Sequence, residues 1–270
     1  MTTINQKSKL RWHYDEGHLT IDGSGPMPEW HSRDEQPWSQ YRRNDLFDVR
    51  INEDITTIGS CAFSSCYGIN SVSLPDTLKC IGEQAFSNCF ELQKIILPEH
   101  LEIIGSSAFE GCMELTTITI PDSVNSIGER AFERCRYLRE VKLPHSLTKI
   151  DRYTFAHCES LTSIIIPDGV TIIDDYAFAN CKYLDTVIIP ESVNSIGCRA
   201  FYGCTRLKTI TIPDSVKNIE NGAFEGCLQL EEVKMSDDIT NVEDIFTGIE
   251  LPVIIVAYLD DLTKKDDKKE

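Results

Sequence analysis

Apolar residues recur along most of the chain with a fixed period of 23 residues. From Ile55 to Asp238 the unit V/L-x-x-I-G-x-x-A-F-x-x-C-x-x-L-x-x-I-x-I-P-D-S is repeated eight times without an insertion. A period between about 20 and 50 residues is typical of a solenoid, in which each turn buries its apolar face against the next. Two columns run through all eight units: Phe63, Phe86, Phe109, Phe132, Phe155, Phe178, Phe201 and Phe224, and Cys66, Cys89, Cys112, Cys135, Cys158, Cys181, Cys204 and Cys227.

Within each unit, the segment that ends in proline predicts a strand. In residues 161–167, Ile164 and Ile166 alternate with Ser163 and Ile165, the period of two expected when one face of a strand is buried. Proline then ends the strand because it has no N–H to donate, and the acidic residue after it favours a turn. Stacked copies of this segment build a parallel sheet on one face of the solenoid.

The rest of the unit predicts the other face, with short strands and helical turns. The pattern Val170-x-x-Ile173 directs two more apolar side chains inward, and the glycine that usually follows suggests a tight turn with a left-handed backbone. Ala-Phe-x-x-Cys-x-x-Leu then spaces apolar residues by three or four, which suits a short helical turn. The glycines of this column are Gly59, Gly82, Gly105, Gly128 and Gly197, with Asp151, Asp174 and Glu220 in the other turns.

Stacked turns leave open strand edges at both ends, so caps are expected. We predict an N-terminal cap in residues 1–54, the repeat array in residues 55–238, a C-terminal cap in residues 239–259 and a charged, disordered tail in residues 260–270. The first cap contains all three tryptophans, and the second continues the apolar pattern through Phe246 and a last strand at residues 253–256.

The unit A-F-x-x-C-x-x-L-x-x-I-x-I-P-x-S-V-x-x-I-G resembles the BspA-type (Treponema-type) leucine-rich repeat, and the resemblance covers all eight turns. The leader is similar to the N-terminal cap of that family, in Gly17–Met27 (GHLTIDGSGPM) and Pro37–Tyr41 (PWSQY). The resemblance implies a leucine-rich-repeat solenoid capped at both ends. It also implies a role like that of family members, which are generally exported or surface-displayed and bind host proteins or other cells.

Charge and hydropathy exclude some partners. With 26 Lys and Arg against 43 Asp and Glu, the net charge is −17, which disfavours nucleic acids and anionic membranes. No apolar run reaches the roughly 18 residues of a membrane helix. Residues 1–10 lack the apolar core of a signal peptide, so we expect a cytoplasmic protein as the chain stands, and a cell-surface or secreted one if an export signal is missing.

The sequence lacks the spacings typical of zinc sites, phosphate loops or catalytic clusters, so we predict no enzyme, no catalytic residue, no metal and no cofactor. An enzymatic site in the cap would need a deep pocket around Trp12, Trp30 and Trp38. The cysteine column is interpreted as small buried apolar side chains, because one thiol per turn forms a straight row unsuited to zinc or disulfides. Cys61, Cys80 and Cys198 lie outside this column and are the candidate reactive thiols.

The solvent-facing position between the two buried strand positions is free to vary, yet three of its residues are isoleucines. An apolar row beside small polar residues suggests a partner site, although β-branched residues also favour exposed strand positions without any function. The candidate partner-binding residues are Ile96, Thr119, Lys142, Ile165, Ile188, Thr211 and Lys234.

A basic island is the second candidate site. Between Arg130 and Arg152 there are seven Lys or Arg against three acidic residues, a pattern that suits an acidic partner, a polyanion or a solvated face. Its arginines are Arg130, Arg134, Arg136, Arg139 and Arg152. We predict a monomer that binds a protein partner through the sheet face, with cell-surface adhesion as one form of that role. The alternative is a structural spacer or an intracellular scaffold with no specific ligand.

Overall fold

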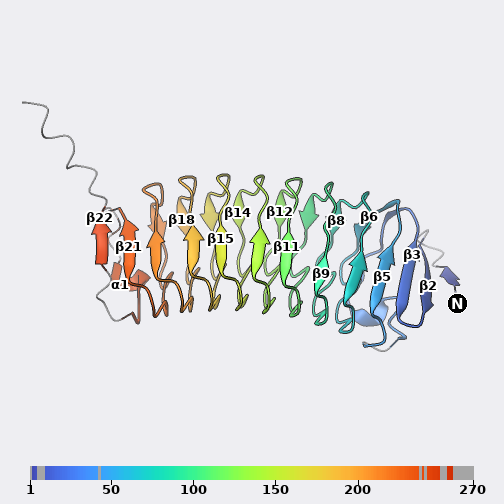
Figure 1. Ribbon diagram of the computed structural model, residues 1–270. Helices are drawn as coiled ribbons and strands as arrows, with labels where there is room; N and C mark the ends of the chain where they lie inside the picture. Colours follow the sequence, from blue (N-terminus) through green and yellow to red (C-terminus); the bar gives the residue numbers. More distant parts are fainter. Residues whose placement is uncertain are drawn as a thin grey trace, which may run out of the picture.

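The computed structural model describes residues 2–4, 10–41, 44–236, 239, 242–249 and 254–257. Figure 1 shows a long stack of similar turns, with the N-terminal strands at one end and β22 at the other. Each turn contributes a strand to a first face, a shorter strand to a second face and a chain of tight turns to a third side. The predicted solenoid of eight 23-residue turns is therefore confirmed.

The first face is the predicted sheet of strands that end at the proline column. Neighbouring strands are parallel and in register at steps of 23 residues, so that Ile118 lies opposite Val141. The strands are β5 (Asp48–Ile51), β7 (Ser71–Ser73), β9 (Lys94–Ile95), β11 (Thr117–Thr119), β13 (Glu140–Lys142), β15 (Ser163–Ile165), β17 (Thr186–Ile188), β19 (Thr209–Thr211) and β21 (Glu232–Met235).

The second face is made of the short strands that follow each proline turn. These also pair in parallel, in one ladder from β4 to β12 and another from β14 to β20. The strands are β6 (Ile55–Ile58), β8 (Cys80–Ile81), β10 (Ile103–Ile104), β12 (Ser126–Ile127), β14 (Lys149–Ile150), β16 (Ile172–Ile173), β18 (Ser195–Ile196) and β20 (Asn218–Ile219).

The third side, around the Ala-Phe-x-x-Cys segment, is a run of tight turns. Within a turn, the N–H of Cys66 donates to the carbonyl of Phe63 three residues back, at 3.1 Å. Between turns, the N–H of Phe63 donates to the carbonyl of Ala85, at 2.7 Å. This alternation of local and inter-turn bonds satisfies the backbone although the segment forms no regular strand or helix.

The prediction of a left-handed backbone at the glycine column was wrong. The glycines of this column have no φ in the left-handed region, and that conformation occurs two and six residues later, for example at Gln84 (φ 54°) and Asn88 (φ 59°). The glycine is needed for a different reason. A Cβ at Gly105 would lie only 2.7 Å from the backbone nitrogen of Glu83 in the preceding turn, so the close approach of two turns excludes a side chain there.

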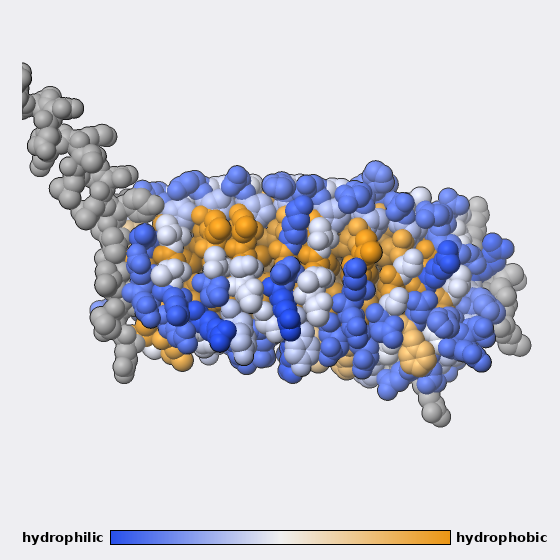
Figure 2. Space-filling view, in the orientation of Figure 1, coloured by the Kyte–Doolittle hydropathy of each residue, from blue (hydrophilic) through white to orange (hydrophobic). Residues whose placement is uncertain are grey.

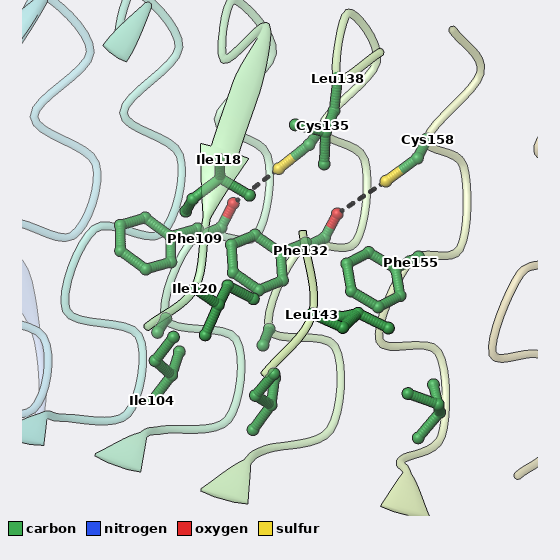
Figure 3. Close-up of a cluster of buried hydrophobic side chains, with 14 of the residues drawn as sticks. Ile104, Phe109, Ile118, Ile120, Phe132, Cys135, Leu138, Leu143, Phe155 and Cys158 are labelled. Carbon is green, nitrogen blue, oxygen red and sulfur yellow. Dashed lines mark hydrogen bonds between the residues drawn. The ribbon is translucent and has the colours of Figure 1, made fainter. Parts of the chain in front are cut away.

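The core is one continuous column of stacked side chains, as Figure 3 shows for Phe109, Phe132 and Phe155. Successive phenylalanine rings of the repeats lie 5.2 to 5.5 Å apart and within 12° of parallel. The stack continues beyond the repeats, because Trp38 covers Phe63 at one end and Phe246 covers Phe224 at the other. Isoleucine and leucine side chains from both sheets fill the space around the rings.

At the N-terminal end, a hairpin pairs with the first strand of the solenoid. Strands β2 (Arg11–Asp15) and β3 (His18–Asp22) are antiparallel, and β3 then pairs in parallel with β5. Strand β1 (Thr2–Ile4) pairs with β2, while β4 (Gly25–Pro26) pairs with β6 on the second face. A 3-10 helix spans Arg33–Glu35.

At the C-terminal end, helix α1 (Val242–Ile245) precedes β22 (Ile254–Ala257), which pairs in parallel with β21. The predicted last strand, at residues 253–256, corresponds to β22 with a shift of one residue. The predicted disordered tail, residues 260–270, lies outside the described residues, and the proposed domain boundaries stay predictions.

Candidate protein-binding face

All seven candidate partner-binding residues are exposed on the first face. The three isoleucines are unusually open for their type, with 71% of Ile96, 66% of Ile165 and 51% of Ile188 accessible to solvent. Figure 2 shows this face as an apolar band that follows the axis of the solenoid and is crossed by polar side chains. The structure therefore places the residues in one row, as the period predicted, and their part in binding stays a prediction.

Strand pairing divides this row into close neighbours. Ile165 lies directly opposite Ile188 in the β15–β17 ladder, Thr119 opposite Lys142, and Thr211 opposite Lys234. Side chains that face each other across a ladder are about 5 Å apart and in contact. The two isoleucines thus form one apolar ridge.

Between these pairs the regular strand pairing is interrupted, although a backbone hydrogen bond of 3.4 Å still joins Thr116 to Gln93 and Thr162 to Arg139 at the start of the strands. The ladder of the first face is interrupted between β9 and β11, between β13 and β15, and between β17 and β19. A shallow hollow in the surface lies at each interruption. We name these hollows furrow 1, furrow 2 and furrow 3 in chain order.

From Ile118 onward, hydrogen bonds distinguish the closed contacts from the open ones. In the β11–β13, β15–β17 and β19–β21 ladders the N–H groups of Ile120, Ile166 and Ile212 donate to the next turn at 2.8 to 3.0 Å, whereas within the described residues the equivalent Leu74, at the β7–β9 contact, makes no such bond. Within the described residues, the equivalent Leu97, Leu143 and Ile189 beside the furrows make no such bond. Their side chains are correspondingly more open, at 6 to 8% accessible against at most 1% for the three in closed ladders. Apolar core side chains therefore form the floor of each furrow.

Sequence reasoning did not predict the furrows, although one pattern in the sequence accompanies furrows 2 and 3. From Ile118 onward, the buried centre of the strand alternates between isoleucine and valine, which doubles the period to 46 residues. Each isoleucine strand pairs with the valine strand after it, and the next contact is open after β13 and β17, whereas β21 pairs with β22. The alternating residues are Ile118, Val141, Ile164, Val187, Ile210 and Val233.

The basic island is largely neutralised by carboxylates from neighbouring turns. Arg130 pairs with Glu133 at 2.6 Å, and Arg152 pairs with Asp175 at 2.7 Å. Lys149 lies between Asp151 and Asp174, whose carboxylates raise its pKa to about 12. Further pairs join Arg134 to Glu110 and Arg136 to Glu159. Four carboxylates from outside the segment lie beside its positive charges, and one of them, Glu159, also pairs with Lys182 at 3.0 Å. The field of the segment is therefore weaker than the sequence count implies.

The cysteine column has a contact that its interpretation as apolar filler missed. Each thiol from Cys89 to Cys227 donates to the carbonyl of a phenylalanine in the preceding turn, at 3.2 or 3.3 Å. Figure 3 shows two of these bonds, from Cys135 to Phe109 and from Cys158 to Phe132. The same carbonyls also accept a local N–H, so a small side chain with a weak donor suits this position.

The three cysteines outside the column have raised pKa values, which lowers their thiolate fraction. Burial is the largest cause for each thiol, and nearby carboxylates add to it: Glu83 for Cys61, Glu29 for Cys80 and Asp175 for Cys198. Cys61 is buried, whereas Cys80 and Cys198 are half-buried. Their surroundings therefore oppose the reactivity that their position outside the column suggested.

The three tryptophans pack together in a closed cluster. Trp30 and Trp12 contact Trp38 edge-on, at ring separations of 5.4 and 6.4 Å, and all three side chains are buried. The pocket that an enzymatic site would need is not formed between these rings. In the part of the chain that the structure describes, no group of three or more His, Cys, Asp or Glu side chains is placed to hold a metal ion.

Residues 39–162 and 148–257 match the family of BspA type leucine rich repeat regions. The chain belongs to this family. The matched ranges contain the turns whose repeated Phe, Cys and strand positions are buried in the core. No curated protein matches the sequence.

Two solved structures resemble this BspA-type protein. A leucine-rich repeat protein from Bacteroides ovatus is 29% identical over 85% of this chain, with a TM-score of 0.69. The alignment covers 64% of that protein, so this chain spans less than two thirds of its length. A leucine-rich repeat protein from Eubacterium ventriosum is 24% identical, with a TM-score of 0.59 and coverage of 86% of this chain and 71% of that one. Among the described residues, no helix has the length and hydrophobicity to cross a membrane.

Proposed function

We propose that this BspA-type chain is a non-enzymatic protein-binding module whose contact surface is the first sheet face. The observation that carries the proposal is the ridge formed by Ile165 and Ile188, two exposed isoleucines that lie opposite each other on paired strands. Solvent-exposed apolar side chains in one continuous patch favour a partner site, because covering them removes apolar surface from water. Small hydroxyl side chains on the same strands, Ser163 and Thr186, would supply a polar rim.

Rigidity supports the same proposal. The side chains of the face project from strands held by inter-turn hydrogen bonds and by the buried stack of rings, so their backbone is ordered before a partner arrives. Binding then requires little further loss of backbone entropy, which leaves more of the contact energy for affinity. Adhesion at a cell surface is the form of this function that the family favours.

Paired substitutions on the two faces test the proposal. Ile165→Asp with Ile188→Asp places two charges on the ridge, and we expect at least tenfold less capture of protein partners from cell extracts. The matched control is Ile103→Asp with Ile172→Asp, because these isoleucines are 42% and 37% exposed on the second face. Circular dichroism checks that both variants fold.

Equal loss from the two double variants would contradict the choice of face. Absence of any saturable partner for the wild-type protein would contradict binding itself and would favour the structural spacer.

A further inference from the structure

We propose that Asn221 is a site of spontaneous deamidation and that the C-terminal cap controls the rate of this modification. Asn221 and Gly222 form the only Asn-Gly pair of the sequence. In such a pair no Cβ on the second residue hinders the approach of its backbone nitrogen to the asparagine side chain. The site lies in the last turn of the array and is independent of the binding face.

The reaction needs water as its co-reactant and no enzyme. The backbone nitrogen of Gly222 loses its proton and attacks the side-chain carbonyl carbon of Asn221. A C–N bond forms, and the amide nitrogen of the side chain leaves as ammonia with that proton. Water then opens the five-membered succinimide ring. Opening at the backbone carbonyl gives isoaspartate, whose main chain runs through the former side chain, and opening at the side-chain carbonyl gives aspartate.

The side chain of Asn221 is free to react. The residue is exposed, and within the described part of the chain its amide forms no hydrogen bond. Gly222 occupies the left-handed column of the third side, where its φ is 67° and that of Arg199 in the preceding turn is 53°. The carbonyl of the exposed amide is therefore accessible both to the neighbouring backbone nitrogen and to water.

The attacking nitrogen, in contrast, is held by the C-terminal cap. The N–H of Gly222 donates to the carbonyl of Asp244 in α1, at 2.7 Å. A carbonyl oxygen stabilises the N–H that donates to it and repels the anion that would replace it, so this bond opposes the loss of the proton. Attack on Asn221 therefore requires that α1 first separates from the last turn.

Two further contacts hold α1 in place. The N–H of Phe224 donates to the carbonyl of Ile245 at 3.1 Å, and the ring of Phe246 covers that of Phe224 at 5.4 Å. The side chain of Phe246 is buried. Because an end of a stacked array opens more easily than its centre, separation of this cap is the local opening that exposes the nitrogen.

Isoaspartate would make this opening permanent. The backbone carbonyl of Asn221, which accepts a 3.2 Å bond from the N–H of Arg199, would become a carboxylate. One carbon would also be added to the main chain before Gly222. The bond to the preceding turn and the bond to Asp244 could then no longer form together in their present positions, so the cap could not return to its original contacts.

The rate of deamidation at pH 8 tests the site. The intact protein is compared with a synthetic peptide of residues 217–226, in which the cap is missing. Mass spectrometry of digests measures the deamidated fraction, and an isoaspartate-specific methyltransferase labels the isoaspartate. We expect the protein to react about tenfold more slowly than the peptide, or slower still, because the reaction must wait for a local opening. Asn221→Gln should remove the isoaspartate signal.

Substitutions at the cap test the control of the rate. Phe246→Ala removes the ring that covers Phe224 and should speed deamidation of Asn221 about tenfold or more, as expected when a large core side chain is lost. Phe246→Leu should give a smaller increase, and it keeps the test valid if the alanine variant does not fold. The matched control is Trp38→Leu, which removes the buried ring over Phe63 at the opposite end and should leave the rate unchanged.

Circular dichroism establishes which of these variants fold. A peptide that does not deamidate, or a signal that survives Asn221→Gln, would overturn the site. Equal rates in the peptide and the wild-type protein, an unchanged rate in the folded Phe246 variants, or equal acceleration by Trp38→Leu would overturn control by the cap.

Discussion

The glycine after the second buried strand position lies where two turns approach most closely. At Gly82, Gly105 and Gly128, an added Cβ would stand 2.5 to 2.7 Å from backbone atoms of the preceding turn. An inter-turn hydrogen bond of 2.8 Å, from the N–H of Gly105 to the carbonyl of Ile81, holds the two turns together there. Asp174 and Glu220 keep the equivalent bond at 2.9 Å with a side chain in the same column, so the close approach belongs to the glycine turns. In those turns the position depends on the absence of a side chain and not on an unusual φ.

We expect Gly105→Ala to destabilise the protein by about 1–3 kcal/mol, the usual cost of forcing a methyl group into a packed interior. Gly226→Asn is the control, because Gly226 has a left-handed φ of 75° in a column where Asn88 and Asn180 adopt the same conformation. Urea unfolding followed by circular dichroism gives the midpoints. A smaller shift for Gly105→Ala than for Gly226→Asn would contradict the close-approach explanation.

His157 lies in the same left-handed column as Asn180 and makes the stability of the protein depend on pH. Burial lowers its pKa below the usual value near 6.5, and Arg134 and Lys182 act in the same direction, while Glu133 and Glu159 oppose them. Between the unfolded and the folded pKa the unfolded chain binds more protons, so the free energy of unfolding falls as pH drops below about 6.5. His157→Asn keeps the left-handed backbone, since Asn180 occupies the next turn of the column. We expect this variant to lose less thermal stability than the wild type between pH 7.5 and pH 5.5, and an identical loss would refute the effect.

At the scale of elements, the sequence predicts the features that follow from residues repeated at the same position of every turn. It does not predict the features that follow from the distance between two adjacent turns. The parallel strands, the ring stack and the exposed row follow from residues 23 positions apart, because each such column has the same surroundings in every turn. The furrows are different, since they arise where adjacent turns separate slightly. The second face shows the same dependence: its ladder stops between β12 and β14, where Gly128 is followed in the column by Asp151, the first side chain at the close approach.

The two candidate sites illustrate this difference. Exposure of Ile165 and Ile188 was predictable, because alternation along a strand fixes which side chains face solvent. Neutralisation of the basic island was not visible in a count along the chain, because Glu110, Asp174 and Asp175 lie about one period away from their partners. Counting charges by turn instead of by segment would have found these pairs.

At the scale of the whole molecule, each turn contacts only its two neighbours, so stability is shared along one dimension. Local unfolding should therefore begin at the ends of the solenoid, where a turn has one neighbour fewer. The reactivity of each column cysteine then measures the unfolding of its own turn. Burial raises the pKa of every thiol from Cys89 to Cys227 that the structure describes in this column, to about 12 for Cys227, so these thiols react only when their turn opens.

We expect iodoacetamide at pH 8 to modify the half-buried Cys80 and Cys198 first, and the column much more slowly. Within the column, Cys227 should react before Cys135 and Cys158, which lie in the middle of the stack. Mass spectrometry of digested samples gives the rate at each site, and labelling in denaturant provides the control, because all eleven thiols should then react alike. A single common rate for Cys227, Cys135 and Cys158 would mean that the solenoid opens as one cooperative unit, since only coupling across all turns would remove the difference between ends and centre.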